Sequence, residues 1–346
     1  MTLETEPSAA GAATHLGISV VIPVYQGVDT LPSLLAELEP LTTLQRTTDG
    51  RAFQITEVLL VWDRGPGRSD RVIRTLQQTY PWVRPIWLSR NFGQHAATLA
   101  GMTSSGGDWI ITMDEDGQHD PAFIGSMLDA AYRDGAQLVY GAPTNPPPHG
   151  RLRNLGSAFA KKLFARALAD QDFAEFNSYR LILGEVGRSV AAYTGTGVYL
   201  DVALSWVVAD ATTAPVTSRD EGRPASNYSL SRLISHFGRL MVSSGTKPLF
   251  FVSWLGIAFV VLGGLVTLWV LFRRVTNDVP IGWASTFVAI MVVGGATLLS
   301  LGIVAQYVGA ATNMSLGKPL YVVVRDPALT FDPALTFDPT ASEDEQ

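Results

Sequence analysis

The sequence contains no cysteine, and only 16% of its 346 residues are charged. Without cysteine the chain has no disulfides, no zinc site built from thiolates and no cysteine nucleophile. Its formal net charge of -6 argues against a general nucleic-acid binder, because such proteins need an excess of lysine and arginine. Hydrophobic residues make up 47% of the chain and its mean hydropathy is +0.19, which is high for a soluble protein. We therefore expect a membrane-embedded part.

The two ends of the chain do not have the composition of packed domains. Residues 1–17 carry Glu4 and Glu6, with no basic start and no continuous apolar core, so they predict a cytosolic, disordered N-terminus rather than a secretory signal. Near the other end, DPALTF occurs at 326–331 and again at 332–337. This stretch is too short and acidic for a packed repeat. We expect a cytosolic tail over 318–346 that is disordered from about residue 326.

Short apolar runs alternate with helical stretches over the first part of the chain. From Ile18 to about Gly141, runs such as ISVVIPV, ITEVLLVW and DWIITM are separated by segments with helical spacing. This alternation predicts an α/β fold with a mostly parallel sheet covered by helices on both faces. We assign residues 18–228 to this domain. Asp63 and the acidic residues after DWIITM then fall on one edge of the sheet, where open α/β sheets bind ligands.

Two further segments have amphipathic patterns. Residues 151–168 place apolar residues at helical spacing with Arg151, Lys161, Lys162 and Arg166 opposite, which fits either a surface helix or one that meets anionic groups at a membrane. Residues 229–247 place Leu233, Phe237 and neighbouring apolar residues on one side. Because a long apolar segment follows, we expect this second helix to lie in the headgroup layer; packing on the domain is the alternative.

Two long uncharged runs indicate a transmembrane domain over 248–317. Leu249 to Phe272 and Val279 to Gly317 contain no charged residue and are long enough to span a bilayer. Two buried helices of a soluble domain are the alternative. Arginine and lysine before the first run and after the second weakly favour both ends on the cytosolic side. We therefore expect a multi-pass protein of the cytoplasmic membrane with its α/β domain, residues 18–228, in the cytosol.

The stretch MDEDGQH at 113–119 places three carboxylates in a row at the end of an apolar run. Asp114, Asp116 and Gln118 alternate along the chain, so an extended or turning backbone can point their oxygens to one side. Hard oxygen ligands of this kind suit Mg²⁺ or Mn²⁺ beside a diphosphate. A calcium-like structural loop and a solvated acidic turn are the alternatives, because this short pattern also occurs by chance.

The sequence resembles the family 2 glycosyltransferases, in particular the polyprenyl-phosphate branch that includes dolichol-phosphate mannose synthase and undecaprenyl-phosphate glucosyl and aminoarabinosyl transferases. The resemblance rests on SVVIPVYQGVDTLPSLLAEL, LSRNFGQHAATLAGM, GDWIITMDEDGQHDP and NYSLSRLISHFGRL, and it covers most of residues 18–325. It implies a nucleotide-sugar-binding fold of the glycosyltransferase A type. It also implies metal-dependent, inverting transfer of a sugar from a UDP- or GDP-linked donor to a polyprenyl phosphate.

The resemblance assigns roles to individual residues. For the nucleotide sugar it implies contacts from Pro23, Tyr25, Asp63, Arg90, Asn91 and Asp114. Asp114, Asp116 and Gln118 are the implied metal ligands, and Asp114, Asp116 and Arg180 the implied catalytic residues. For the acceptor phosphate it implies Arg153 and Ser157. Arg219 and Arg223 are further candidates there, with a solvated surface position as the alternative.

The chain also departs from the family pattern. Members usually carry DDGS after the second strand, whereas this chain has WDRG at 62–65. Glu115 and Gly117 stand where the family commonly has small and apolar residues, and an arginine expected near YGAP is missing. The WDRG departure keeps one rival hypothesis open, a catalytically silent membrane scaffold or regulator of the same fold. The other rival is a processive polysaccharide synthase of the same superfamily, but such enzymes resemble a pattern with Q-x-x-R-W that precedes no tryptophan here, and two spans make a poor polymer channel. The glycine-rich spans permit a homo-oligomer.

Overall fold

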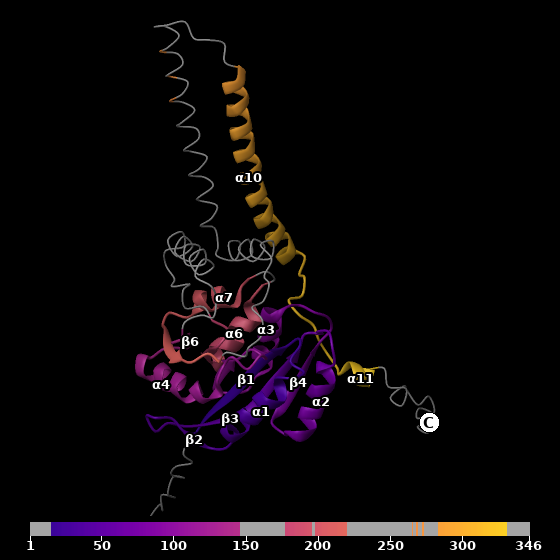
Figure 1. The fold of residues 1–346 in the computed structure, drawn as a ribbon, viewed down its shortest axis with the longest axis vertical. Coiled ribbons are helices and arrows are strands. Elements are labelled where there is room, and N and C mark those ends of the chain that lie inside the picture. Colours follow the sequence, from indigo (N-terminus) through magenta and orange to yellow (C-terminus); the bar gives the residue numbers. More distant parts are fainter. Residues whose placement is uncertain are drawn as a thin grey trace, which may run out of the picture.

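The structure is a computed structural model that describes residues 15–145, 177–195, 198–219, 265, 268, 272 and 283–330. Its centre is a mixed sheet in which most strands run in one direction (Figure 1). The strands are β1 (Leu16–Val24), β2 (Gln45–Arg46), β3 (Ala52–Trp62), β4 (Val83–Leu88), β5 (Trp109–Thr112), β6 (Leu138–Pro143), β7 (Arg180–Leu183), β8 (Ala211–Val216) and β9 (Val323–Val324).

The strands follow the order β8-β6-β7-β5-β1-β3-β4-β9, and β2 pairs with β3. The neighbours β5-β1, β1-β3, β3-β4 and β6-β8 are parallel, whereas β7 and β9 run antiparallel to their partners. The strand order reverses beside β1, which has β3 on one side and β5 on the other. Crevices at such a reversal, beyond the carboxyl ends of the strands, are where this kind of sheet binds ligands.

Helices cover both faces of the sheet, as the sequence predicted (Figure 1). One face carries α1 (Leu31–Leu38), α2 (Ser69–Thr79) and α4 (Ile124–Asp134), and the other carries α3 (Gln94–Ser104), α6 (Gly184–Tyr193) and α7 (Leu200–Val207). Short 3₁₀ turns lie at Glu39–Thr42 and Pro121–Phe123. Because both faces are covered, nearly every residue of β1 is buried. This explains its continuous apolar run, where a half-exposed strand would alternate.

The chain after residue 283 forms α10 (Trp283–Ser315), β9 and the short α11 (Pro327–Thr330). Figure 1 shows α10 standing away from the sheet, after which the chain returns to pair with β4. Asp326 binds Arg74 of α2 through both carboxylate oxygens, each at 2.7 Å. The tail that was expected to be disordered from about residue 326 is described as far as Thr330, with Asp326 in this ion pair and Pro327–Thr330 in α11. The rest of the tail lies outside the described residues, and its disorder stays a prediction.

Among the residues described, no helix combines the length and the hydropathy that crossing a bilayer requires. The first of the two uncharged runs is described only at Leu265, Leu268 and Phe272. The predicted interfacial helix at 229–247 and the basic helix that begins at Arg151 lie outside the described residues.

Candidate active site

The sheet brings the residues predicted for the donor and the metal to one edge. Tyr25 follows β1, Asp63 follows β3, Arg90 and Asn91 come shortly after β4, and Asp114 comes shortly after β5. Parallel pairing sets Val24 level with Trp62 and Val21 level with Thr112, so these strand ends are adjacent. β7 runs the other way, and its first residue, Arg180, pairs with Thr112. Residues far apart in the sequence thus meet beside β1.

Asp114 is held by two side chains from different elements. The Gln94 amide donates to Asp114 Oδ1 at 2.6 Å, and the Ser178 hydroxyl donates to Asp114 Oδ2 at 2.6 Å. Gln94 belongs to the stretch LSRNFGQHAATLAGM that carries the family resemblance, and Ser178 lies two residues before Arg180, but neither was predicted as a site residue. A carboxylate that is hydrogen-bonded at both oxygens still has further lone pairs, so Asp114 is oriented and can accept another ligand.

The buried His119 side chain holds the loop that carries Asp114. Its Nδ1 accepts a hydrogen bond from the Asp114 backbone amide at 3.0 Å, so in the neutral ring the proton sits on Nε2. The ring stacks on Tyr179 with centroids 4.8 Å apart. Burial lowers the pKa of His119, which favours this neutral, accepting form. His119 therefore fixes the backbone of Asp114.

The adjacent carboxylates of Asp114, Glu115 and Asp116 point in different directions. Glu115 turns to the loop after β1, where it accepts the Tyr25 amide at 3.0 Å and the Gln26 amide at 2.8 Å. Burial raises the pKa of Glu115, while the backbone amides favour its charged form. Asp116 accepts the Gln118 amide at 3.1 Å across a tight turn. Glu115 thus fixes the loop that carries Tyr25, and Asp114 and Asp116 remain as the candidate ligands.

The oxygen atoms of this loop are suitable ligands for a hard divalent cation. Asp114 and Asp116 offer carboxylate oxygens and the exposed Gln118 offers an amide oxygen, which are the ligand types that Mg²⁺ and Mn²⁺ take. Within the described ranges, no three histidine, aspartate or glutamate side chains converge as a metal cluster. Mg²⁺ is commonly held by one or two carboxylates together with substrate phosphates, so two aspartates are a suitable protein share. The metal ligand set stays a prediction.

Asp63 connects two loops of the same edge. Its carboxylate, only 3% exposed, accepts the backbone amides of Phe92 at 2.7 Å and Gly93 at 2.8 Å. Gly93 has φ 93°, a conformation that suits glycine and starts α3. Burial raises the pKa of Asp63, and the two amides and Arg90 oppose that shift. Asp63 therefore holds the loop of Arg90 and Asn91; its predicted contact with base and ribose stays a prediction.

Replacing Asp63 with alanine should destabilise the domain by about 2–4 kcal/mol, because two partly buried amides lose a charged acceptor. Nucleotide binding should weaken as well, since the loop that carries Arg90 and Asn91 is released. Urea unfolding and nucleotide titration of the variant measure the two effects. Asp63→Asn serves as the matched control, because its amide oxygen can accept only part of what the carboxylate accepts, so its loss should be smaller. An alanine variant as stable as the parent would contradict this role.

Arg180 lies below the edge in a buried ion pair. Its Nε and Nη2 donate to Asp201 of α7 at 2.6 and 2.9 Å, and both side chains are 6% exposed. Its Nη1 lies 3.3 Å from both Thr112 Oγ1 and the Ser178 carbonyl. Arg180 thus supports Ser178, which holds Asp114. The predicted catalytic role of Arg180 stays a prediction, whereas Asp201, which the sequence analysis did not single out, is its partner.

Arg219 lies beside the loop that carries Asp114, Asp116 and Gln118. Its backbone amide donates to the Gln118 carbonyl at 3.1 Å, and its guanidinium binds Glu37 at 2.6 Å and Asp120 at 2.9 Å. The side chain is 38% exposed, so an anion can reach it. The other residues predicted for the acceptor phosphate, Arg153, Ser157 and Arg223, lie outside the described residues.

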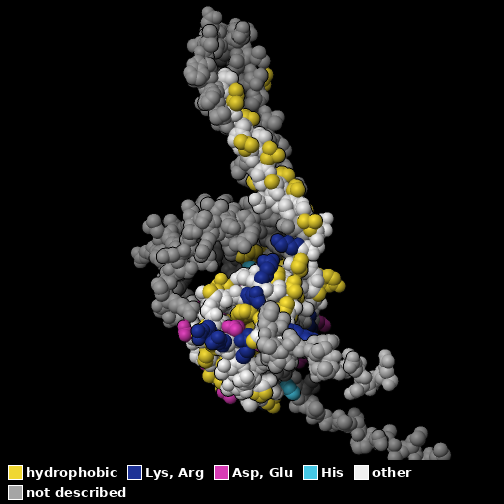
Figure 2. Space-filling model, turned by 90° about the vertical axis from the view of Figure 1, so that its right-hand side faces the viewer, with side chains coloured by type: hydrophobic (Ala, Val, Ile, Leu, Met, Phe, Trp, Pro, Cys, Tyr) yellow, Lys and Arg dark blue, Asp and Glu magenta, His cyan; other side chains and the backbone are white. Residues whose placement is uncertain are grey.

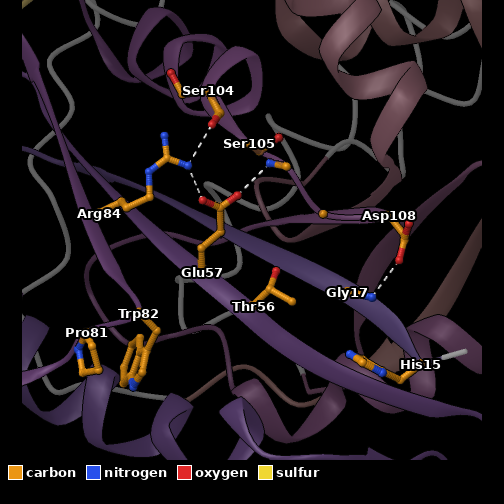
Figure 3. A pocket seen from close by; sticks show the side chains of 12 residues that line it. His15, Gly17, Thr56, Glu57, Pro81, Trp82, Arg84, Ser104, Ser105 and Asp108 are labelled. Atoms are coloured by element: carbon orange, nitrogen blue, oxygen red, sulfur yellow. Dashed lines mark hydrogen bonds and ion pairs between the residues drawn. The ribbon is translucent and has the colours of Figure 1, made fainter. Parts of the chain in front are cut away.

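A hollow of about 570 Å³ lies at the opposite edge of the sheet (Figure 3). Glu57 stands in its middle, where it accepts the Ser19 hydroxyl and the Gly106 amide, each at 2.7 Å, and pairs with Arg84. Asp108 accepts the Gly17 amide at 2.8 Å. These contacts join the amino ends of neighbouring strands. The hollow contains none of the predicted site residues, and its carboxylates are satisfied within the fold.

The sequence profile described as Glycosyl transferase family 2 matches residues 19–193, and the chain belongs to this family. An uncharacterized glycosyltransferase of Bacillus subtilis is 27% identical over 89% of this chain and 94% of its own length. An undecaprenyl-phosphate 4-deoxy-4-formamido-L-arabinose transferase of Pseudomonas paraeruginosa is 26% identical over 89% of each chain. A bactoprenol glucosyl transferase of Shigella phage SfV is 22% identical over 88% of this chain and 97% of its own. The family resemblance inferred from the motifs is confirmed.

Proposed function

We propose that this protein transfers a sugar from a nucleotide-diphosphate sugar to a polyprenyl phosphate at the cytosolic face of a membrane, with inversion at the sugar carbon. The observation that carries the proposal is the meeting of Tyr25, Asp63, Asp114 and Asp116 at the strand reversal beside β1. Relatives named for bactoprenol and undecaprenyl-phosphate transfer, similar along nearly their whole length, support the acceptor class.

Different residues of this sheet edge serve the nucleotide-sugar donor and the acceptor. Tyr25 and the Asp63-held loop of Arg90 and Asn91 bind the nucleotide, while Asp114 and Asp116, with Gln118, would hold Mg²⁺ or Mn²⁺ on the diphosphate. When bound, such a cation neutralises charge on the departing nucleotide as a Lewis acid. The chain's own task is then to align the anomeric carbon with the acceptor oxygen, and Gln94, Ser178 and His119 contribute by fixing Asp114.

The acceptor chemistry explains why no strong general base is required. A phosphomonoester has its second pKa at roughly 6, so the attacking oxygen is already largely ionised near neutral pH. Attack on the sugar carbon and departure of the nucleoside diphosphate occur in one displacement, which inverts that carbon. The site must instead offset repulsion between two phosphate-bearing substrates. Arg219, which is already balanced by Glu37 and Asp120, is the described candidate for this.

Membrane attachment is part of the proposal. No charged residue occurs in the run from Val279 to Gly317, which contains α10, or in the run from Leu249 to Phe272. Large apolar side chains along α10 are exposed, including Ile290 at 60%, Leu298 at 71% and Leu301 at 58%. Figure 2 shows this apolar column above a group of lysine and arginine side chains on the domain. Apolar surface of this kind on a helix clear of the fold suits a lipid environment.

The decisive experiment is transfer of labelled sugar from UDP- and GDP-sugars to undecaprenyl phosphate by the full chain in detergent. We expect an organic-extractable product from one donor with Mg²⁺ or Mn²⁺, and its loss with EDTA because the leaving diphosphate is then not neutralised. Adding the metal back after EDTA should restore activity, which controls for unfolding. Nucleotide binding without transfer from any donor would overturn the proposal and favour a silent scaffold of the same fold.

A further inference from the structure

A cluster of side chains on α2 and β4, which we call the Arg74 seat, binds the chain that follows α10. Its members are Arg74, Asp70 and Trp87. The Arg74 guanidinium donates to Asp70 at 2.7 Å and lies 5.0 Å from the centre of the Trp87 ring. Both oxygens of Asp326 bind it at 2.7 Å, and the Asp326 side chain is only 15% exposed. A two-oxygen pairing with arginine demands a carboxylate in one defined orientation.

The residues on either side of Asp326 add backbone contacts to this seat. Before it, Val323 and Val324 pair with Leu88 and Trp87, and the Val322 carbonyl accepts the Ser89 amide at 2.9 Å. After it, Pro327 starts α11, and the Ala328 amide donates to Asp326 Oδ1 at 2.9 Å. The segment that binds the seat thus consists of a short strand, an aspartate and a turn that begins with proline. Most of its contacts are made by backbone atoms and by the Asp-Pro pair.

The sequence contains this docking segment twice. DPALTF begins at Asp326 and again at Asp332, six residues further on. A shift by an even number keeps every side chain of a strand on the same face, so sliding the second copy into the seat leaves the alternation intact. Leu329 and Thr330 then take the places of Val323 and Val324, and Asp332, Pro333 and Ala334 take those of Asp326, Pro327 and Ala328. Each position receives an apolar, β-branched or identical residue.

We propose that the Arg74 seat accepts either copy of DPALTF, so that the connection between α10 and the catalytic domain exists in two lengths. The first register dominates, because Val323 and Val324 are the better strand formers and because the Tyr321 hydroxyl binds Thr103 at 2.9 Å in that register. The second register releases six residues, which extend by roughly 20 Å. An effect of the longer connection on how the acceptor reaches the site would rest on the proposed function. The existence of the two registers does not.

Pulsed electron spin resonance on the full chain in detergent tests this directly, because a chain without cysteine can be labelled only where cysteine is introduced. Nitroxides go on Gln78→Cys, exposed on α2, and Leu329→Cys, 55% exposed on α11. In the second register residue 329 sits beside Leu88, so its distance from residue 78 changes. We expect one main distance in the parent, and a second well-defined distance that becomes the main one in Asp326→Asn.

The matched control is the same substitution in the second copy. Asp332→Asn alone should keep the main distance, and Asp326→Asn/Asp332→Asn should lose both defined distances. Identical distributions for Asp326→Asn with and without Asp332→Asn would overturn the proposal. So would a second distance that fades when labelled protein is diluted with unlabelled protein, since the docked copy would then belong to another chain. Neither readout depends on enzymatic turnover, so failure of the transferase assay and failure of this inference are separate results.

Discussion

Asp116→Asn is expected to lower sugar transfer at least about 100-fold, because it removes one of the two carboxylate charges that the Asp114–Gln118 loop offers to a metal-bound diphosphate. The fold should be unaffected. Asp116 uses Oδ1 to accept the Gln118 amide at 3.1 Å, and the oxygen of asparagine can accept the same bond. The melting temperature should stay the same or rise slightly, since Asp114 and Glu115 lose a like-charged neighbour.

Initial rates across a Mn²⁺ or Mg²⁺ titration measure the effect. The variant should need more metal for half-maximal rate, which separates a lost ligand from a general loss of activity. Asp210→Asn, an exposed carboxylate before β8, is the control and should leave both rate and metal requirement unchanged. Transfer within a few-fold of the parent at limiting metal would contradict the role given to Asp116, and a lower melting temperature would indicate a structural role instead.

The fold and the functional edge could be predicted because both follow from local patterns. Apolar runs separated by helical stretches fix a doubly covered sheet, and parallel strands bring their carboxyl ends to one edge. Asp63 and Asp114 were therefore placed on the same edge from the sequence alone. The direction in which each side chain points at this edge could not be predicted in the same way. Asp63 and Glu115 both turn to backbone amides of neighbouring loops, which makes them organisers of the edge.

Long-range pairs explain what sequence reasoning missed. Glu115 contacts Gln26, 89 positions earlier, and Arg74 binds Asp326, 252 positions later. Such contacts cannot be predicted from hydrophobic periodicity or residue propensity, because both are properties of a short window of sequence. The acidic C-terminal tail was expected on composition to be disordered from about residue 326, but Arg74 of α2 binds Asp326 at the start of that stretch. Composition indicates whether a segment can form its own core, whereas here Val323 and Val324 pair with β4 and Asp326 binds Arg74 of α2.

The buried pair of Arg180 and Asp201 should give the largest stability effect in the chain's described part. Both side chains are 6% exposed, and the two hydrogen bonds between them measure 2.6 and 2.9 Å. Asp201→Ala removes the compensating charge but leaves the guanidinium in the interior, which should cost about 3–5 kcal/mol of folding free energy. For a domain of this size that is a fall in melting temperature of roughly 10 °C, followed by circular dichroism.

The double variant Arg180→Met/Asp201→Ala distinguishes a missing partner from a hole in the core. With both charges gone and an apolar side chain in place, part of the lost stability should return, because no uncompensated charge remains buried. Asp49→Ala, which breaks the exposed contact with Arg51, should leave the melting temperature unchanged. If Arg180 acts only by supporting Ser178 beneath Asp114, the double variant should regain stability without regaining transfer. Full recovery of transfer would show that neither charge is needed to position Asp114, and an Asp201→Ala variant as stable as the parent would contradict the pair's structural role.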